Sequence, residues 1–310
     1  MPRSLDRRTL IGGLTAVTGL SLASDLSAAP DSLSFLVVGD WGRNGNSHQR
    51  DVAIQMDRAA AEKGSRFTIS VGDNFYEDGV TSTTDPLWQS SYEQVYTGAH
   101  LQTPWYVALG NHDYGGIPQA QIDYSAISPR WKMPARFFKV SGDTLGRSDL
   151  DLFIIDTSPL MTGLANRAEG RAAANVRSQD TDAQLAWLDR ELGASTAKWK
   201  LVVGHHTLYS GGSTHGDTPE MIARVLPILQ KHKVTAYING HDHDLQHIER
   251  AGIAYVCTGA GSEVRPVKAV EGTKFCVSQS GFSVITVTAD ALQLEFRNYL
   301  GEAVYRSRVA

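Results

Sequence analysis

The sequence feature that most constrains the fold is a pattern that occurs five times along the chain. An apolar run ends in a glycine, and the next residue carries an oxygen or nitrogen donor. Such a run predicts a strand buried on both faces, as in the parallel sheets of α/β proteins. These proteins place ligands at the carboxyl ends of their strands, so we expect the five donors to form one site. The five occurrences are Val38-Gly39-Asp40, Val71-Gly72-Asp73, Leu109-Gly110-Asn111, Val203-Gly204-His205 and Asn239-Gly240-His241.

The segments between these strands predict an α/β domain. Apolar residues at helical spacing over 51–63 separate strands at 33–38 and 67–71, which predicts a βαβ unit. After residue 253, apolar and polar residues alternate, a pattern typical of antiparallel strands. No linker divides residues 30–310, so one domain is expected. Further strands are predicted at 105–109, 137–140, 150–155, 201–203, 234–238, 254–256, 282–286, 292–296 and 304–306, and further helices at 87–96, 119–127, 183–192 and 222–229.

One stretch, 157–180, has no clean periodicity and is rich in Ala, Gly, Asn and Arg. A loop of that length inside a compact domain is typically a lid or a mobile segment. The sequence leaves its role open.

The first 29 residues are expected to be an export signal. Arg7-Arg8 precedes an apolar run over 10–23, and Ser27-Ala28-Ala29 offers small residues for cleavage. The run is too short to span a bilayer, so we expect no stable membrane anchor. The paired arginines favour a twin-arginine signal over an ordinary secretory one. We therefore expect the export machinery as a partner and a periplasmic or secreted protein.

Charge and cysteine content further restrict the class of protein to which this chain could belong. The formal net charge is −4, with no basic excess of the kind that nucleic-acid binding needs. The two cysteines, Cys257 and Cys276, could form a disulfide in an exported protein, or they could be two buried thiols. Neither lies in a donor cluster, so no catalytic role is expected for them.

The donors after the strands suit a pair of metal ions. Two carboxylates, a phenol, an amide and three imidazoles are too many for one tetrahedral zinc, and no thiolate is among them. Two ions about 3.5–4 Å apart, bridged by a carboxylate, can clamp the attacking and leaving oxygens of a phosphoryl displacement. The candidate ligands are Asp40, Asp73, Tyr76, Asn111, His205, His241 and His243.

Tyr76 indicates the identity of one metal. A phenol with a pKa of about 10 becomes a phenolate ligand only beside a strong Lewis acid, which points to Fe(III). A trivalent ion also keeps a bound water acidic enough to act as hydroxide in acid. The alternative is that Tyr76 is an aromatic residue of a lid.

Five motifs in this order resemble those of the purple acid phosphatases, within the metallophosphoesterase superfamily. The resemblance is greatest to the small, tartrate-resistant type, and it extends over nearly all of residues 30–310. It implies an α/β fold, a four-layer sandwich of two mixed β-sheets flanked by helices, with the metals at the carboxyl ends of the strands. The motifs are Gly-Asp-Trp-Gly at 39–42, Gly-Asp-Asn-Phe-Tyr at 72–76, Gly-Asn-His-Asp at 110–113, Val-Val-Gly-His at 202–205 and Gly-His-Asp-His at 240–243.

The resemblance also implies two metal sites that share one carboxylate, with a metal-bound hydroxide as the nucleophile. Fe(III) would be held by Asp40, Tyr76 and His243, a divalent iron, zinc or manganese ion by Asn111, His205 and His241, and Asp73 would bridge the two.

Two further histidines would face the substrate. His112 would stabilise the transition state or protonate the leaving oxygen, and His215 matches a second substrate-facing histidine of the small type. His112 could instead be a structural residue oriented by Asp113. His206 follows a ligand, and alternation along the strand predicts that it points away from the metals.

The expected function is therefore that of an exported acid phosphatase that hydrolyses phosphate monoesters of small molecules or phosphoproteins. Three alternatives remain open: a phosphodiesterase or nucleotidase on the same scaffold, a redox-active di-iron protein that generates reactive oxygen species, and a non-catalytic iron- or phosphate-binding module.

Overall fold

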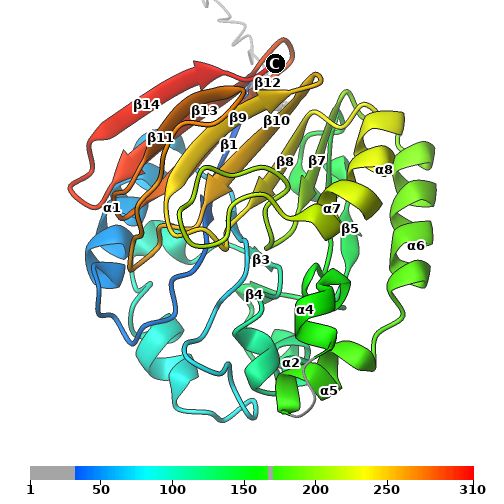
Figure 1. The fold of residues 1–310 in the computed structure, drawn as a ribbon. Helices are drawn as coiled ribbons and strands as arrows, with labels where there is room; N and C mark the ends of the chain where they lie inside the picture. The colour runs from blue at the N-terminus through cyan, green and yellow to red at the C-terminus, as the bar shows by residue number, and fades with distance from the viewer. Residues whose placement is uncertain (1–31, 167–169) are drawn as a thin grey trace, which may run out of the picture.

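Two seven-stranded sheets form the centre of the molecule in the computed structural model, which describes residues 32–166 and 170–310 (Figure 1). The export signal expected at 1–29 lies outside the described residues. The first sheet comprises β1 (Ser32–Val38), β2 (Thr68–Ser70), β3 (Trp105–Val107), β4 (Trp131–Lys132), β12 (Gly281–Thr288), β13 (Leu292–Asn298) and β14 (Ala303–Arg308). The second comprises β5 (Phe138–Val140), β6 (Leu150–Ile154), β7 (Trp199–Val203), β8 (Ala236–Asn239), β9 (Leu245–Arg250), β10 (Ile253–Thr258) and β11 (Thr273–Val277).

Both sheets are mixed. The strand order is β14-β13-β12-β1-β2-β3-β4 in the first and β11-β9-β10-β8-β7-β6-β5 in the second. In the first sheet β1 to β4 are parallel and β12 to β14 antiparallel, as the alternating pattern predicts. In the second sheet, β6, β7, β8 and β10 are parallel to one another. Residues 254–256, predicted as an antiparallel strand, lie in β10. This strand is antiparallel to β9 but parallel to β8, so the prediction is wrong for its pairing with β8. Strands β9 and β11 were not predicted from the sequence, because their polar residues obscure their strand character.

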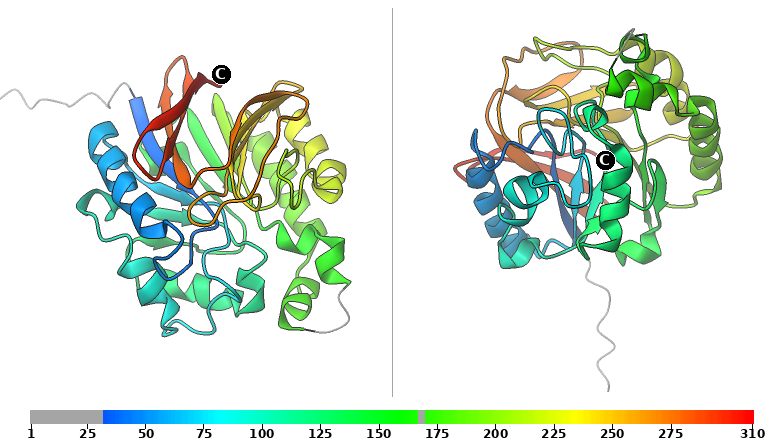
Figure 2. Two further views of the ribbon diagram at one scale, coloured as in Figure 1. Left: turned by 60° about the vertical axis from the view of Figure 1, so that its left-hand side comes forward. Right: turned by 90° about the horizontal axis from the view of Figure 1, so that it is seen from below.

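Helices cover the outer faces of the sheets (Figures 1 and 2). On the first sheet α1 (Gln49–Lys63) packs against β1 and β12. On the second, α6 (Thr181–Ala194), α7 (Pro219–Arg224) and α8 (Leu226–Lys231) supply apolar side chains to a separate core. The shorter α-helices are α2 (Pro118–Asp123), α3 (Gly142–Leu145), α4 (Thr162–Ala165) and α5 (Arg171–Arg177), the 3₁₀ turns are Ala99–Leu101, Asp113–Gly115, Tyr124–Ala126 and Ser158–Leu160, and Trp88–Glu93 is a π-helix.

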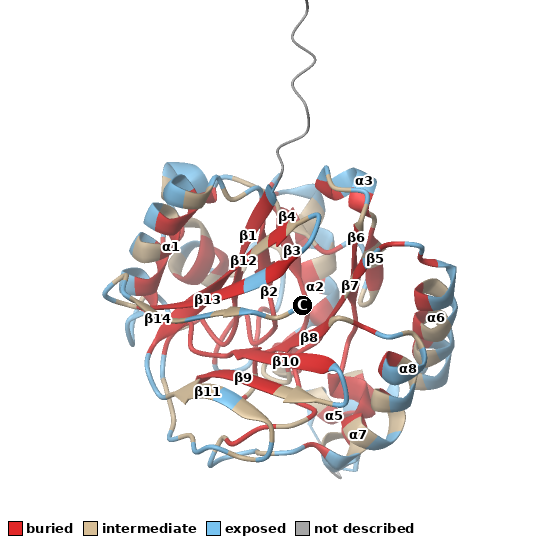
Figure 3. Cartoon of the chain, turned by 90° about the horizontal axis from the view of Figure 1, so that it is seen from above, coloured by how far each residue is buried: buried red, intermediate tan, exposed pale blue. Residues whose placement is uncertain are grey.

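Most strands of both sheets are buried, as Figure 3 shows in red, and alternation along them divides the core into two parts. On β6, Leu152 and Ile154 belong to the main core, whereas Phe153 belongs to the core under α6. The strands are therefore apolar on both faces, which is why they read as continuous apolar runs. Helix, sheet, sheet and helix form four layers, and the predicted fold class is confirmed. No helix in the described part of the chain is long and apolar enough to cross a membrane.

Two helical predictions differ from the structure for identifiable reasons. The segment 157–180, predicted as a loop, contains α4, α5 and a 3₁₀ turn, which are too short to show a helical period. The single helix predicted at 222–229 is instead divided between two helices, α7 and α8, which are separated at Val225. Pro227 lies just after the break, and its ring and missing N–H disfavour a continuous helix there.

The two cysteines lie on different strands and are both free. Cys257 on β10 and Cys276 on β11 pair with the same residue, Gln246, from opposite sides of β9. Two interstrand spacings, about 9–10 Å, separate their backbones. Because a disulfide needs Cα atoms within about 7 Å, the fold favours two thiols.

Candidate metal centre and active site

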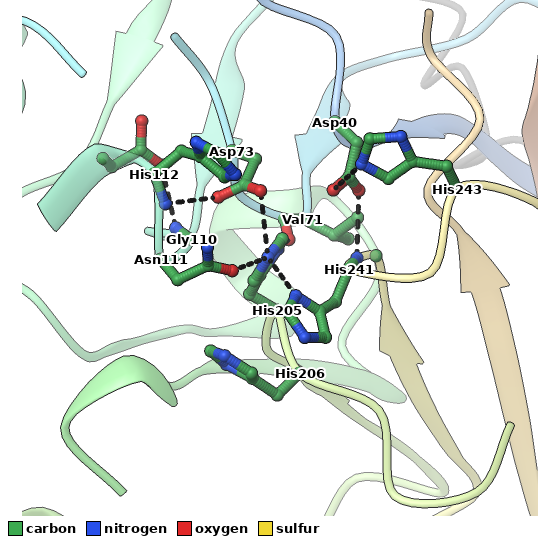
Figure 4. Close-up of polar contacts among 12 residues, drawn as sticks. Asp40, Val71, Asp73, Gly110, Asn111, His112, His205, His206, His241 and His243 are labelled. Carbon is green, nitrogen blue, oxygen red and sulfur yellow. Dashed lines mark hydrogen bonds and ion pairs between the residues drawn. The ribbon is translucent and has the colours of Figure 1, made fainter. Parts of the chain in front are cut away.

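The predicted ligands lie where the carboxyl ends of the parallel strands of both sheets meet (Figure 4). From the first sheet, Asp40 follows β1, Asp73 follows β2 and Asn111 follows β3. From the second, His205 follows β7 and His241 follows β8. The site therefore lies between the two sheets, and each sheet supplies part of it.

Three of these residues have a left-handed backbone. The φ angles are 57° at Asp40, 51° at Asp73 and 72° at His241. This conformation costs a residue with a Cβ of the order of 1–3 kcal/mol, and it persists only where the surrounding structure imposes it. The backbone therefore turns at each of these donors, within about three residues of the strand end.

The glycines before the donors leave room for carboxylates of neighbouring loops. A Cβ on Gly110 would overlap Oδ1 of Asp73, and a Cβ on Gly240 would overlap Oδ2 of Asp40. Each glycine thus accommodates a ligand from a different strand end. The recurrent glycine in the sequence pattern has a packing cause.

One group of donors surrounds the phenol of Tyr76. Its Oη lies 3.2 Å from Oδ1 of Asp40, 3.1 Å from Oδ2 of Asp73 and 3.1 Å from Nε2 of His243. A phenol has one proton and can satisfy only one acceptor.

A second group surrounds the ring of His205. Its Nε2 lies 3.2 Å from Oδ1 of Asn111, 3.2 Å from Nδ1 of His241 and 3.4 Å from Oδ2 of Asp73. Its Nδ1 donates to the backbone carbonyl of Val71 at 2.9 Å, which leaves Nε2 to face the group.

The two groups share a single atom, Oδ2 of Asp73. Each group holds more lone pairs than protons, so a cation in each would satisfy acceptors that hydrogen atoms cannot. Donor atoms of Asp40, Asp73 and His205 all lie within 4.8 Å of one another, close enough for metal binding. The residues present therefore fit a pair of metal ions with a carboxylate between them.

The pKa shifts within this cluster also favour bound cations. Burial raises the pKa of Asp73, but the charge of His205 and its hydrogen bond outweigh burial and hold this pKa well below its usual range. Burial lowers the pKa of His205, yet Asp73 and then Asp40 raise it to about 9. Burial, together with the charges of Asp40 and Asp73, raises the pKa of Tyr76 well above 10. The carboxylates thus draw a proton onto His205, and a bound cation could replace that positive charge.

His112 lies beside both groups with a fixed orientation. Its Nδ1 donates to the backbone carbonyl of Glu77 at 2.5 Å, and its backbone N–H donates to Oδ1 of Asp73 at 2.9 Å. The ring packs against Tyr76 with centroids 4.5 Å apart. Because a carbonyl can only accept, Nδ1 carries a proton, and Nε2 is the nitrogen available to a substrate.

Asp113 has a different role from orienting His112. Its carboxylate accepts from the backbone N–H of Gly110 at 2.8 Å, from that of Asn74 at 3.1 Å and from the amide of Gln121 at 2.8 Å. Burial and the nearby Asp73 raise its pKa to about 7. Asp113 fixes the loops that carry Asp73 and Asn111. Its position in the Gly-Asn-His-Asp motif was the only indication in the sequence that Asp113 belongs to the site. The sequence alone could not show which groups its carboxylate binds.

His215 reaches the site from the loop after β7. Its ring stacks on His241 with centroids 3.9 Å apart, and its Nε2 accepts from Nη1 of Arg265 at 3.2 Å. Oδ2 of Asp242 accepts from Ser210 Oγ at 2.5 Å and from the backbone N–H of Gly216 at 3.2 Å. Asp242 thereby holds the loop on both sides of His215.

Two further residues complete the surroundings. His206 lies outside the two donor groups, as expected, but its ring lies 4.3 Å from that of His241 and it lines the cavity. The expectation that it points away from the site is therefore only partly right. Nδ1 of His206 lies 2.8 Å from Oγ1 of Thr157, which also accepts from the backbone N–H of His206. Neither Thr157 nor Arg265 was predicted from the sequence, since neither follows an apolar run and a glycine.

A cleft opens beside the donor groups. A cavity of about 500 Å³ is lined by residues that include His112, His206, His215 and His241. An adjoining cavity of about 270 Å³ reaches Asp73 and is lined in addition by His243 and Arg265. A phosphorylated molecule could thus reach the predicted metal ligands. Of the nine site residues named from the sequence, six line these cavities, and Asp40, Tyr76 and His205 lie in the donor groups beside them.

Comparisons with known proteins agree with this geometry. Residues 33–245 match the family described as calcineurin-like phosphoesterase. Purple acid phosphatase 4 of Arabidopsis thaliana is 37% identical over 93% of this chain and 89% of its own length. Tartrate-resistant acid phosphatase type 5 of Homo sapiens is 31% identical over 96% of each chain.

Solved structures show the same fold. GAP50, described as the anchor in the inner membrane complex of Plasmodium, superposes with a TM-score of 0.76 at 25% identity, over 89% of this chain and 88% of that one. The purple acid phosphatase PPD1 of yellow lupin seeds superposes with a TM-score of 0.64 at 15% identity, over 89% of this chain and 53% of that one.

The relatives imply a dinuclear metal centre, and a candidate metal site lies where the family motifs meet. The chain therefore belongs to the purple acid phosphatase family of calcineurin-like phosphoesterases and is an acid phosphatase, a phosphoric monoester hydrolase.

Proposed function

We propose that the enzyme hydrolyses phosphate monoesters in acid with an Fe(III) ion and a divalent iron, zinc or manganese ion. The observation that carries this proposal is the sharing of Oδ2 of Asp73 by two donor groups, of which only one contains a phenol. The ligands proposed for Fe(III) are Asp40, Asp73, Tyr76 and His243, and those for the divalent ion are Asp73, Asn111, His205 and His241.

Charge balance supports this pairing. Two carboxylates and a phenolate contribute about −3 against +5 from the two ions, which leaves about +2 to attract an anionic substrate. Bound ions would supply Lewis acidity toward the phosphate and an activated water as the nucleophile.

His112 is proposed as the general acid. With Nδ1 fixed on the carbonyl of Glu77, a neutral ring has no proton on Nε2. Donation from Nε2 therefore requires the doubly protonated form of the ring. That proton would pass to the ester oxygen as the P–O bond breaks, and the leaving group departs as an alcohol.

His215 is proposed as a second group that faces the phosphate. Its Nε2 accepts from Arg265, so a neutral ring carries its proton on Nδ1. Stacking on His241 and the loop held by Asp242 limit its movement. It would donate a hydrogen bond to a phosphate oxygen while His112 serves the leaving group.

The visible spectrum of the purified, oxidised protein tests the metal assignment. We expect a purple phenolate-to-Fe(III) band that is absent from the Tyr76→Phe variant. A colourless protein with full phosphatase activity would contradict the role of Tyr76 and favour a centre of divalent ions.

Substrate assays test the reaction class. Monoesters should be hydrolysed faster than matched bis-esters, and the reverse order would favour a phosphodiesterase. Peroxide-dependent oxidation that persists in His112→Ala, without monoester hydrolysis, would favour a redox role. Phosphorylated small molecules and phosphoproteins are both candidate substrates.

We also propose that the protein is exported, on the basis of Arg7-Arg8 and the apolar run that follows them. Replacing both arginines by lysine should retain the full-length precursor inside the cell, as measured by fractionation and activity assay. Unchanged export of the double variant would favour an ordinary secretory signal.

A further inference from the structure

The cleft has two arms of opposite character. Both arms are lined by Asn111, His112, His215 and His241. The smaller arm, here called the phosphate arm, continues to Asp73, Thr214, His243 and Arg265. The larger arm, here called the acidic arm, continues to Glu77, Asp78, Met161, Leu164, Ala172, His206 and Glu220.

Arg265 is the cation of the phosphate arm. Its backbone N–H donates to the carbonyl of His243 at 2.9 Å, and its guanidinium contacts the ring of His215. Among the described residues it has no carboxylate within ion-pair distance. A half-buried guanidinium without a carboxylate partner suits phosphate oxygens, which it can bind in a bidentate manner.

The acidic arm carries carboxylates without basic partners. Within the described ranges, neither Asp78 nor Glu220 has a Lys or Arg within ion-pair distance, and no Lys or Arg lines this arm. Glu77 contributes less charge because Arg43 lies 2.8 Å from its carboxylate. Oε1 of Glu220 accepts from Oγ1 of Thr162 at 2.5 Å, which fixes that carboxylate at the wall of the arm.

Apolar side chains lie beside these carboxylates. Met161, Leu164 and Ala172 come from the segment between β6 and α6 and line the same arm. Methyl or methylene groups next to a positive charge would match this surface. A further phosphate or carboxylate would be repelled by it.

We propose that the enzyme is selective for phosphate monoesters whose leaving group carries a positive charge next to small alkyl groups, that is, amino-alcohol phosphates. The phosphate would occupy the arm that contains Arg265, and the ammonium group would lie toward Asp78 and Glu220. This inference rests on the proposed function and specifies its substrate class.

A pair of isosteric esters tests the proposal. Phosphocholine and 3,3-dimethylbutyl phosphate have the same shape, and only the first carries a positive charge. We expect kcat/KM to be about fivefold higher for phosphocholine, the upper end of what single exposed ion pairs contribute. The ratio should fall toward one as salt is raised, because screening weakens contacts between partly exposed charges. Equal kcat/KM values at low salt would overturn the proposal.

Variants locate the cause of the preference. Glu220→Gln and Asp78→Asn should each lower kcat/KM for phosphocholine and leave that for 3,3-dimethylbutyl phosphate unchanged. Glu271→Gln, at an exposed carboxylate that lines neither arm, is the matched control and should leave the ratio intact. A ratio that survives in the Glu220→Gln, Asp78→Asn double variant would overturn the proposal. Failure to hydrolyse either ester would overturn the proposed function and this inference with it.

Discussion

Oδ2 of Asp73 lies 3.4 Å from Nε2 of His205, and the two residues belong to different sheets. Asp73 follows β2 in the first sheet, and His205 follows β7 in the second. The charged contact therefore spans the junction between the sheets at the point where the donor groups meet. Any cation bound there would connect the two halves of the fold.

Replacing Asp73 should empty both predicted metal sites. We expect Asp73→Asn to contain fewer than one ion per chain, against two in the parent, because one oxygen serves both groups. Asparagine tolerates the left-handed backbone at this position, so the change tests ligation rather than backbone strain. Metal analysis of the purified proteins measures this, with the exposed Asp290→Asn as control. Two retained ions would rule out the bridging role.

His112 should matter for turnover and not for metal content. We expect His112→Ala to keep both ions and to lower kcat about 10²-fold or more, the contribution typical of a positioned general acid. The control is His100→Ala, at an exposed ring outside the cleft. An unchanged kcat in acid would remove the proposed proton transfer.

Gly110→Ala should damage the site through packing alone. The added Cβ would overlap the carboxylate of Asp73, so we expect loss of metal affinity without any change in the ligands themselves. Gly163→Ala is a matched control, because nothing lies within 4 Å of the Cβ that it would add. Isothermal titration of the metal-free proteins with the divalent ion compares the two. Equal affinities would contradict the packing role assigned to this glycine.

Glu62 should contribute to stability only above strongly acidic pH. The hydrogen bond from Arg297, and then that from Lys63, lower the pKa of Glu62 from 4.5 to about 2. A lowered pKa means that the stabilisation is present above about pH 4.5 and is lost as the pH falls toward 2. Because the carboxylate is 53% exposed, we expect Glu62→Gln to cost less than about 1 kcal/mol at pH 6. Denaturant unfolding of both proteins between pH 6 and 2 should show the difference vanish; a constant difference would contradict the assignment.

Both cysteines should react as free thiols. Their places on β10 and β11, with β9 between them, keep them apart. Thiol-reagent counting on protein unfolded without reductant should therefore give about two thiols per chain. A count of zero would require a rearranged edge of the second sheet.

Much of this site was predictable because its pattern is local. Buried parallel strands have to be apolar on both faces, and the carboxylates that approach from neighbouring loops require glycine at the strand ends. The apolar run, the glycine and the donor are consecutive at each strand end, so the sequence records the pattern, although the carboxylate that approaches Gly110 or Gly240 comes from a distant loop. The order of five such motifs then indicated the fold and the candidate ligands.

Other features depended on the tertiary structure because their partners are distant in sequence. Arg265 meets His215 across 50 residues, and Asp113 supports the loop of Asn74 across 39. Polar strands such as β9 show no period that distinguishes them from loops, because their neighbours in the sheet decide which side chains are buried. The sequence by itself determined which donors follow the strands; only the packing of the two sheets decided that one oxygen of Asp73 serves two groups and that the cleft has a basic and an acidic arm.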